Sequence, residues 1–552
     1  MNRLPPTLAC SLALALAGCR DAPAASSSAT VSMVVVADDA LDPGDVAPPP
    51  VAPPDAAPSA ASAAAPSPDA APVAISADGG GAPTTVRIVA LRGWTPVRKT
   101  PQREGPLAGY LRAGAVVEVE DDRPVGTEEC AFPSVPRSGW YRVRGGGYLC
   151  VGGNFAALAP ARDFRTPTQP DFDASMPYSY AVSYGRSNMY RRIPTSADLR
   201  LYEPWRFRAD ASLDGGADEA AVAIVDAGRP DRPTLGELEG DPTSPVIRRM
   251  LTGMYVALDR AVRDSASGSR YLLTQSGGLV RDDRLSTLRT APTFEGTALD
   301  ATRGLPMAWM VSEFGWTYTV SPEGRVARNT RAPRLTPVPL ADAPPLIVGN
   351  RTFFRTADGG AVLATNVRRA TLRPPPEGVA ELERWIDVDL DEQVLVAYEG
   401  ARPVFTTLIS SGRRTSRNAP ERFETPAGSF RIQTKHVSTT MDGDTATDGP
   451  YSIEDVPWVM YFQGSYALHA AFWHSYYGWR MSHGCVNLSP PDARRVFLWA
   501  DPQIPPGWHG VHADANTRPG SRVEIRHSRD NRSAESERPA GAARAVPEQS
   551  GQ

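Results

Sequence analysis

The sequence is poor in cysteine and histidine and has no marked excess of one charge. It has five cysteines and seven histidines in 552 residues, and its 58 basic and 62 acidic residues give a net charge of −4. Both signs are interspersed, which argues against nucleic acid or an anionic membrane surface as the partner. A chain of this length exceeds one hydrophobic core, so two or three domains with linkers are expected.

The apolar run near the N-terminus, residues 8–17 after the basic Arg3, is too short for a permanent transmembrane helix. It is typical of an export signal that is removed. It ends in Leu16-Ala17-Gly18-Cys19, which resembles the bacterial lipobox. The resemblance implies a signal peptide over residues 1–18 and a lipid on Cys19, hence a lipid anchor in the cell envelope, on the periplasmic side of the outer membrane. An ordinary secretory signal with an incidental cysteine is the alternative.

The remaining cysteines can be assigned by elimination. Cys10 is lost with the signal, which leaves Cys130, Cys150 and Cys485 in an exported, oxidising setting besides Cys19. Cys130 and Cys150 share one small β-rich segment, so we predict a disulfide between them. Cys485 is then unpaired, and an exported protein that keeps one free thiol usually has a use for it.

Two segments have compositions that cannot form a core. Residues 19–81 are almost entirely Ala, Pro, Ser, Val and Asp, and residues 528–552 are polar. We expect a disordered tether and a disordered tail. As a coil the tether averages on the order of 45 Å end to end, and as polyproline II it reaches about 190 Å.

Short apolar alternations separated by Gly and Pro turns run through residues 84–155, as in Val86-Arg87-Ile88-Val89, and predict a small all-β barrel. Segments such as Gly139-Trp140-Tyr141-Arg142-Val143 resemble the bacterial SH3-like domain that is often attached to cell-wall enzymes. Wall binding is the hypothesis that follows, and a packing module is the alternative.

Residues 170–380 contain aromatic-rich pieces between acidic and Pro-rich connections, and we interpret them as a mixed, mostly β spacer region. Within it, apolar residues recur at helical spacing and predict a helix over residues 245–263. They are Ile247, Met250, Leu251, Met254, Tyr255 and Leu258.

From residue 383 the pattern changes to strong strands. Residues 385–390 and 393–398 predict a hairpin that opens a sheet domain ending near residue 527. Further strands are predicted over residues 403–410, 428–435, 456–462, 465–469 and 522–526. A helix is expected after Cys485, because Ser489 is suited to the N-cap and Pro490 to the first helical position.

The richest chemistry lies in Ser482-His483-Gly484-Cys485-Val486-Asn487-Leu488, with His469 sixteen positions before Cys485. A thiol attacks as the thiolate, so Cys485 needs a base, and His469 and His483 are the candidates. In an extended segment, His483 and Cys485 share one face. The backbone N–H groups of Gly484 and Cys485 are candidate donors to the oxyanion of a tetrahedral intermediate.

The surrounding sequence closely resembles the L,D-transpeptidase catalytic domain, also called the YkuD domain. The resemblance covers residues 383–527, a quarter of the chain, and includes Thr425-Pro426-Ala427-Gly428, which matches that family's Thr-Pro-x-Gly turn. It implies a β-sandwich-like domain with a short helix after the catalytic loop. The chain as a whole is therefore predicted to be multidomain and mainly β.

Carried over by position, the resemblance implies that Cys485 is the nucleophile, His469 the proton acceptor and donor, and His483 a second histidine lining the site. Ser482 and Gly484 shape the loop. Two positions depart from the family: Ala470 stands where Gly is common, and Asn487 where Arg is frequent. These departures put substrate detail in doubt rather than chemistry. The histidines outside the motif, His436, His474, His509, His512 and His527, are assigned packing or surface roles.

The implied reaction is a two-step exchange on peptidoglycan stem peptides. Cys485 attacks the carbonyl after the L centre of the diamino acid, releasing D-alanine and leaving a thioester. A second stem's amine then accepts the acyl group, whereas water gives carboxypeptidase activity. No cofactor is needed, because a thioester conserves the energy of the amide. Acylation of Cys485 by carbapenems is also implied.

Three other interpretations compete. His469, His474, His483 and Cys485 are all acceptable zinc ligands, although a five-residue spacing does not bring His469 and His474 together without a turn. An inactive domain would leave a wall-binding protein. A cysteine peptidase of the NlpC/P60 type has its nucleophile before its histidine, the opposite order to this chain.

Overall fold

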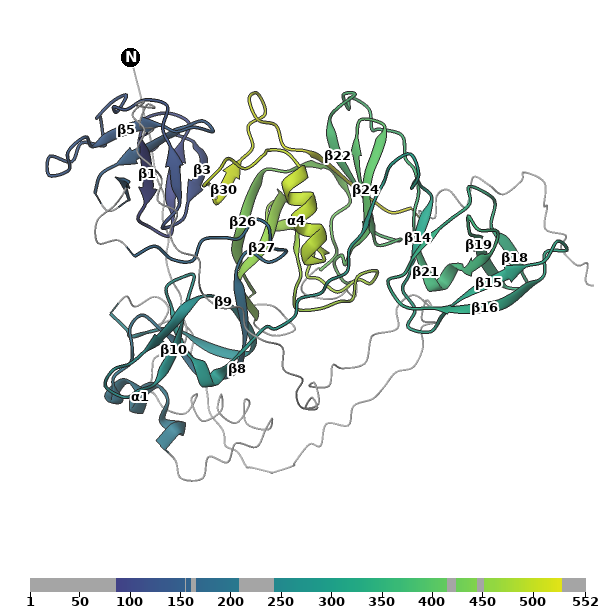
Figure 1. The fold of residues 1–552 in the computed structure, drawn as a ribbon, viewed down its shortest axis with the longest axis horizontal. Helices are drawn as coiled ribbons and strands as arrows, with labels where there is room; N and C mark the ends of the chain where they lie inside the picture. Colours follow the sequence, from purple (N-terminus) through teal and green to yellow (C-terminus); the bar gives the residue numbers. More distant parts are fainter. Residues whose placement is uncertain are drawn as a thin grey trace, which may run out of the picture. The chain divides into compact units, whose positions relative to one another are not determined.

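The computed structural model describes residues 86–153, 155–159, 165–207, 243–414, 423–443 and 451–528. These residues are mainly β and form several sheets (Figure 1), which confirms the predicted mainly β class. They belong to one compact unit, and the predicted domain bounds stay a prediction. The signal peptide, Cys19, the tether and all but the first residue of the predicted tail lie outside the described residues. Among those described, no helix has both the length and the apolar composition needed to cross a membrane.

The first described segment is all β. β1, β4 and β7 form one antiparallel sheet, and β3, β2, β6 and β5 pair in that order. Their apolar side chains close a core that includes Leu111, Tyr141 and Leu149. The structure joins Cys130 and Cys150 in a disulfide. The SH3-like resemblance stays a prediction. The strands are β1 (Arg87–Ala90), β2 (Thr95–Arg98), β3 (Leu107–Leu111), β4 (Val116–Glu118), β5 (Gly139–Arg142), β6 (Tyr148–Val151) and β7 (Ala156–Leu158).

The helix predicted over residues 245–263 is wrong, because this segment is the long strand β9 (Val246–Arg263). It lies between β8 and β10 in an antiparallel sheet, and its pairing with β8 shifts register at three points. Two of these shifts add a residue to β9 and one adds a residue to β8, so the alternation along β9 is reset and its apolar side chains recur at three and four instead of two. The neighbouring elements are β8 (Ser179–Tyr190), α1 (Ser196–Tyr202), the 3-10 helices η1 (Pro204–Phe207) and η2 (Asp282–Arg284), β10 (Arg270–Thr274), β11 (Leu279–Arg281) and β12 (Leu285–Thr287).

The rest of the middle region forms two small antiparallel sheets, one of β17, β14 and β21 and one of five strands. Its buried Met307 and Trp309 pack with Trp385 and Tyr398 of the last domain. The elements are β13 (Thr297–Ala298), β14 (Met307–Met310), β15 (Gly315–Val320), β16 (Val326–Ala332), β17 (Pro337–Pro339), β18 (Leu346–Val348), β19 (Arg351–Arg355), β20 (Ala361–Leu363), η3 (Ala364–Asn366) and β21 (Val367–Ala370).

The last domain opens with the predicted hairpin, which is confirmed as β22 (Arg384–Asp389) and β23 (Val394–Glu399). They lie in a six-stranded sheet with the order β13, β24, β23, β22, β31 and β25. The single strand predicted over residues 428–435 is two strands, because the chain leaves this sheet after β25 (Gly428–Arg431) and joins β27 in another sheet. The remaining elements are β24 (Arg402–Leu408), β26 (Thr434–Gly443), β27 (Tyr451–Gln463), β28 (Tyr466–Ala470), β29 (Val486–Leu488), α4 (Pro490–Trp499), β30 (Gly510–His512) and β31 (Arg522–Arg526).

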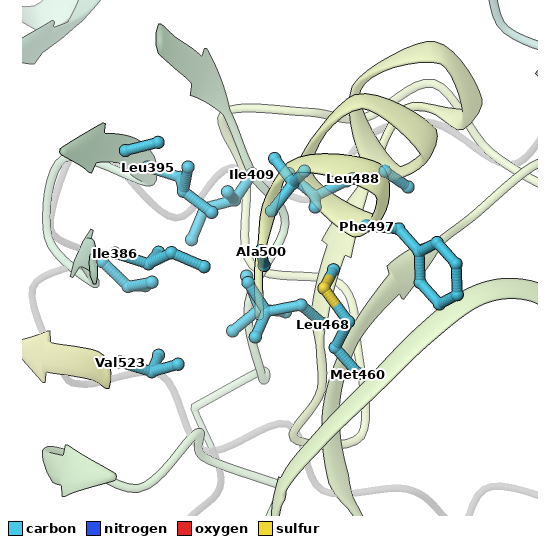
Figure 2. Packing of buried hydrophobic residues seen from close by; sticks show 14 of the residues in the cluster. Ile386, Leu395, Ile409, Met460, Leu468, Leu488, Phe497, Ala500 and Val523 are labelled. Carbon is cyan, nitrogen blue, oxygen red and sulfur yellow. The ribbon is translucent and has the colours of Figure 1, made fainter. Parts of the chain in front are cut away.

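The core of this domain lies between the two sheets and α4. Figure 2 shows Ile386 and Leu395 from the six-stranded sheet facing Leu468 and Leu488, with Phe497 of α4 beside them. α4 begins as predicted: the Ser489 hydroxyl accepts a hydrogen bond from the Asp492 N–H, and Pro490 follows it. Because β28, β29 and α4 share this core, both ends of the loop from β28 to β29, residues 471–485, are anchored to packed elements.

Candidate active site

Cys485 directly precedes β29, which runs parallel to β28 with Leu468 opposite Val486 and His469 opposite Asn487. Leu468 and Val486 point into the core. Side chains alternate along a strand, so Ala467 and His469 of β28 and Asn487 of β29 face the other way. Cys485 packs against the buried cluster that contains Ala467, so it lies on that side. The strand pairing and this packing therefore place the thiol and His469 on one face, opposite the face that Leu468 and Val486 bury.

The Cys485 thiol is free and partly exposed, and its Sγ lies 3.6 Å from the carbonyl oxygen of Ser465. Desolvation by the surrounding side chains raises its pKa to about 11, although the backbone N–H of Ala467 acts in the opposite direction. At neutral pH the sulfur keeps its proton, so an attack on a carbonyl needs a base.

His469 has the properties of that base. Its side chain is 2% exposed, and its Nδ1–H donates to the Ala470 carbonyl oxygen at 3.0 Å. The proton on Nδ1 leaves the lone pair on Nε2. Burial lowers the pKa of the imidazole to about 4, so it is neutral at pH 7. The ring stacks on Trp473 with centroids 5.8 Å apart, which fixes its orientation.

His483 lies in a different environment from His469. Its Nε2 accepts a hydrogen bond from the Arg413 guanidinium at 3.0 Å, and its ring packs against Phe423 and Tyr451. Residues 483–485 form bends, so the expectation of an extended segment with His483 and Cys485 on one face is wrong. Because Arg413 occupies Nε2, His469 is better placed to accept the thiol proton.

Side-chain hydrogen bonds shape the loop before Cys485. The Ser482 hydroxyl donates to the Cys485 carbonyl and accepts from the Gly484 N–H at 3.1 Å. Gly484 has a φ of +124°, and a Cβ there would lie 2.5 Å from the Tyr466 ring. The Thr425 hydroxyl donates to the Gly484 carbonyl at 2.8 Å and accepts from the Gly412 N–H at 2.9 Å.

One predicted oxyanion donor is already engaged in this arrangement. The Gly484 N–H donates to the Ser482 hydroxyl. The N–H of Cys485 is the other donor that the sequence suggested. The loop therefore offers the Cys485 N–H as its backbone donor to an oxyanion, and a second donor has to come from another group.

Comparison with known families assigns the domain that holds these residues. Residues 383–525 match the family model of the YkuD domain, described as the L,D-transpeptidase catalytic domain. This part of the chain belongs to the YkuD family. The resemblance seen in the sequence is confirmed for these residues.

Solved structures similar to the chain include several L,D-transpeptidases. One from Xylanimonas cellulosilytica (residues 123–326) is 27% identical, covers 28% of this chain and 64% of that chain, and has a TM-score of 0.19. One from Stackebrandtia nassauensis is 21% identical and has a TM-score of 0.19. The match covers 27% of this chain and 58% of that chain. The chain thus spans less than two thirds of either. The Enterococcus faecium catalytic domain acylated by ertapenem is 26% identical, covers 26% and 97%, and has a TM-score of 0.20. A comparison with curated proteins found no match.

The sequence interpretation missed several residues that organise the YkuD site. Thr425 was noted only as part of a turn, yet it binds the catalytic loop. Gln393 was placed in the hairpin, but its amide bonds both the backbone N–H and the hydroxyl of Ser411, beside the loop. His474 was assigned to packing, and it contacts Asn487. The Thr-Pro-x-Gly motif was an available signal for Thr425; local sequence holds none for the other contacts.

The zinc interpretation finds no geometric support in the described ranges. In these ranges, no three His, Cys, Asp or Glu side chains lie close enough together to hold a metal ion. His474 instead receives the Tyr476 N–H at Nδ1 and contacts Asn487 through Nε2.

The buried histidines predict an acid-sensitive fold. Burial lowers the pKa of four of them, to about 4 for His436, His469 and His474 and well below the ordinary value of 6.5 for His509. Between pH 6.5 and 4 the unfolded chain binds protons that the folded chain does not. The free energy of unfolding therefore decreases as the pH is lowered through this range. A histidine whose pKa falls from 6.5 to about 4 contributes on the order of 3 kcal/mol at most.

Three buried carboxyls oppose this trend in part, because burial raises the pKa of Glu454 to about 7, of Asp492 to about 6 and of Glu203 above its ordinary value. The histidines outnumber them, so we expect Tm to fall by on the order of 5 °C from pH 7 to pH 4.5. Differential scanning calorimetry across this range measures it. A constant or rising Tm would show that these imidazoles titrate normally.

Proposed function

We propose that this protein is an L,D-transpeptidase that acts on peptidoglycan stem peptides through a thioester on Cys485. One observation carries the proposal: within a YkuD domain, a free thiol shares one face of the β28–β29 pair with a buried, neutral imidazole. A nucleophile with an oriented base is the equipment for acyl transfer.

The first step is acylation of the thiol. When the carbonyl after the L centre of the donor's diamino acid reaches Cys485, the sulfur bonds to carbon and its proton passes to Nε2 of His469. The resting pair is neutral, with pKa values of about 11 and about 4, so proton transfer accompanies attack instead of preceding it. The imidazolium then protonates the departing amine of D-alanine, and the thioester remains.

The second step reverses the proton movements. Neutral His469 takes a proton from an incoming amine, the amine attacks the thioester, and the sulfur leaves with a proton from the imidazolium. A side-chain amine of a second stem gives a cross-link, and other amines give attachment to a different acceptor. Water at the same position gives L,D-carboxypeptidase activity, the alternative outcome.

We propose that this chemistry takes place in the cell envelope. The lipobox at Cys19 and the tether over residues 19–81 support a lipid anchor on the periplasmic side of the outer membrane, and both rest on sequence alone. The role of the barrel at residues 84–155 in wall binding rests on its SH3-like resemblance. We expect no cofactor and no nucleic-acid partner.

Product analysis on purified sacculi is the experiment that tests the function. The purified protein should release D-alanine and form new cross-links or amine adducts, which mass spectrometry of the digested sacculi distinguishes from tripeptides made with water. Incubation with a carbapenem should add the mass of one molecule, and peptide mapping should locate it on Cys485. Unchanged sacculi together with an unmodified thiol would favour the third candidate, a non-catalytic wall-binding lipoprotein.

A further inference from the structure

The His474 ring has hydrogen-bond neighbours at both nitrogens. Its Nδ1 accepts the backbone N–H of Tyr476 at 3.3 Å, and its Nε2 lies 3.0 Å from Nδ2 of the Asn487 amide. Burial lowers the pKa of His474 to about 4, so the ring is neutral at pH 7 and carries one proton. Because Nδ1 accepts, the proton is on Nε2, and Nε2 must donate.

Only the oxygen of the Asn487 amide can accept that proton. The oxygen and nitrogen of an amide exchange places by a half-turn of the group, and the hydrogen-bond network decides which atom faces which partner. The His474 tautomer therefore requires the half-turn of the amide that brings Oδ1 to Nε2 in place of Nδ2. The Asn487 NH2 group then occupies the other amide position.

That other position is buried and unpaired. Asn487 is 3% exposed, and Oδ1, which stands at this position before the half-turn, has no hydrogen-bond partner among the residues that the structure describes. Asn487 lies opposite His469 and shares the face of Cys485. The pair His474 and Asn487 thus presents an N–H donor on the side of the strand pair that holds the thiol and the base.

We propose that Asn487 is a catalytic residue whose Nδ2–H donates to the oxyanion formed when Cys485 attacks a carbonyl. His474 is a positioning residue that holds the amide through Nε2–H to Oδ1. As the sulfur–carbon bond forms, the carbonyl π electrons move to oxygen, and Asn487 stabilises that charge without losing its proton. This inference rests on the proposed function and supplies the donor that Gly484, engaged with Ser482, does not.

Two reactions of the same thiol separate this role from a structural one. Acylation by a carbapenem passes through an oxyanion, whereas alkylation by iodoacetamide requires the thiolate but no oxyanion. For Asn487→Ala we expect acylation about 100-fold slower, followed by intact mass, with alkylation within about twofold of wild type. Asn487→Asp keeps an oxygen for His474 but has no donor, so its acylation should fall at least as far.

Variants of other residues complete the design. His474→Phe removes the support of the amide and should slow acylation about tenfold. His474→Gln, which can still donate to Oδ1, should recover part of the loss. The control is Asn188→Ala, which deletes another buried amide, bonded to the Tyr202 carbonyl in the β8 region, and should leave acylation unchanged.

The outcomes are distinguishable. Wild-type acylation rates in both Asn487 variants would overturn the inference, and so would an equal fall of acylation and alkylation. If calorimetry shows that Asn487→Ala is unfolded, the acylation rates of the isosteric Asn487→Asp and of His474→Phe decide whether the inference holds. A wild-type protein that is alkylated but never acylated would refute the proposed function itself.

Discussion

Replacing Cys485 with alanine is expected to reduce D-alanine release and cross-link formation on isolated muropeptides by at least about 10³-fold. The sulfur is the atom that bonds to the acyl group, and Cys485 is the free cysteine of the described residues. The alanine variant should stay folded, because the thiol is partly exposed and Sγ makes only a long contact to the Ser465 carbonyl. Chromatography of muropeptides with mass detection gives the rate.

The matching control is a comparison of Tm between wild type and Cys485→Ala, which we expect to agree within a few degrees. A carbapenem should add no mass to the variant. Turnover at the wild-type rate by a folded Cys485→Ala protein would eliminate the thioester mechanism and leave the YkuD domain with another nucleophile.

Replacing His469 with glutamine is expected to slow acylation of Cys485 by about 10³-fold near pH 7. The thiol pKa of about 11 leaves almost no thiolate at this pH, so loss of the base removes the route for the proton. The residual rate should then depend on hydroxide and rise about tenfold per pH unit. The wild-type rate should instead be nearly constant from about pH 5 to about pH 10, between the pKa values of about 4 and about 11.

Carbapenem acylation followed by stopped-flow fluorescence or intact mass gives both pH profiles. His512→Gln is the control, because this half-buried histidine lies on β30 and its replacement should leave the profile unchanged. If His469→Gln keeps the flat wild-type profile, the base is another group, and His483 is the first to test.

The error at β9 shows the limit of periodicity. The sequence pattern of residues 246–263 suits an amphipathic helix, but the strand is paired on both sides and bulges against β8. Bulges depend on the partner strand, which is more than 50 residues away in the chain, so no local window reveals them. The hairpin of β22 and β23 was predictable because its pairing is local and its alternation is regular.

The sequence by itself determined the thiol, its two candidate bases, the N-terminus of α4 and the family of residues 383–525, because these depend on residue types at short spacing. Only the tertiary structure decided how they are used. The parallel pairing of β28 and β29 places His469 on the face of Cys485. The Arg413 guanidinium donates a hydrogen bond to Nε2 of His483, and the Thr425 hydroxyl binds the catalytic loop. The contact of His474 with Asn487 spans 13 residues and depends on the ring tautomer, which is set by a backbone N–H. Hydrogen bonds between distant segments are fixed by packing, and short-range sequence patterns contain no information about them.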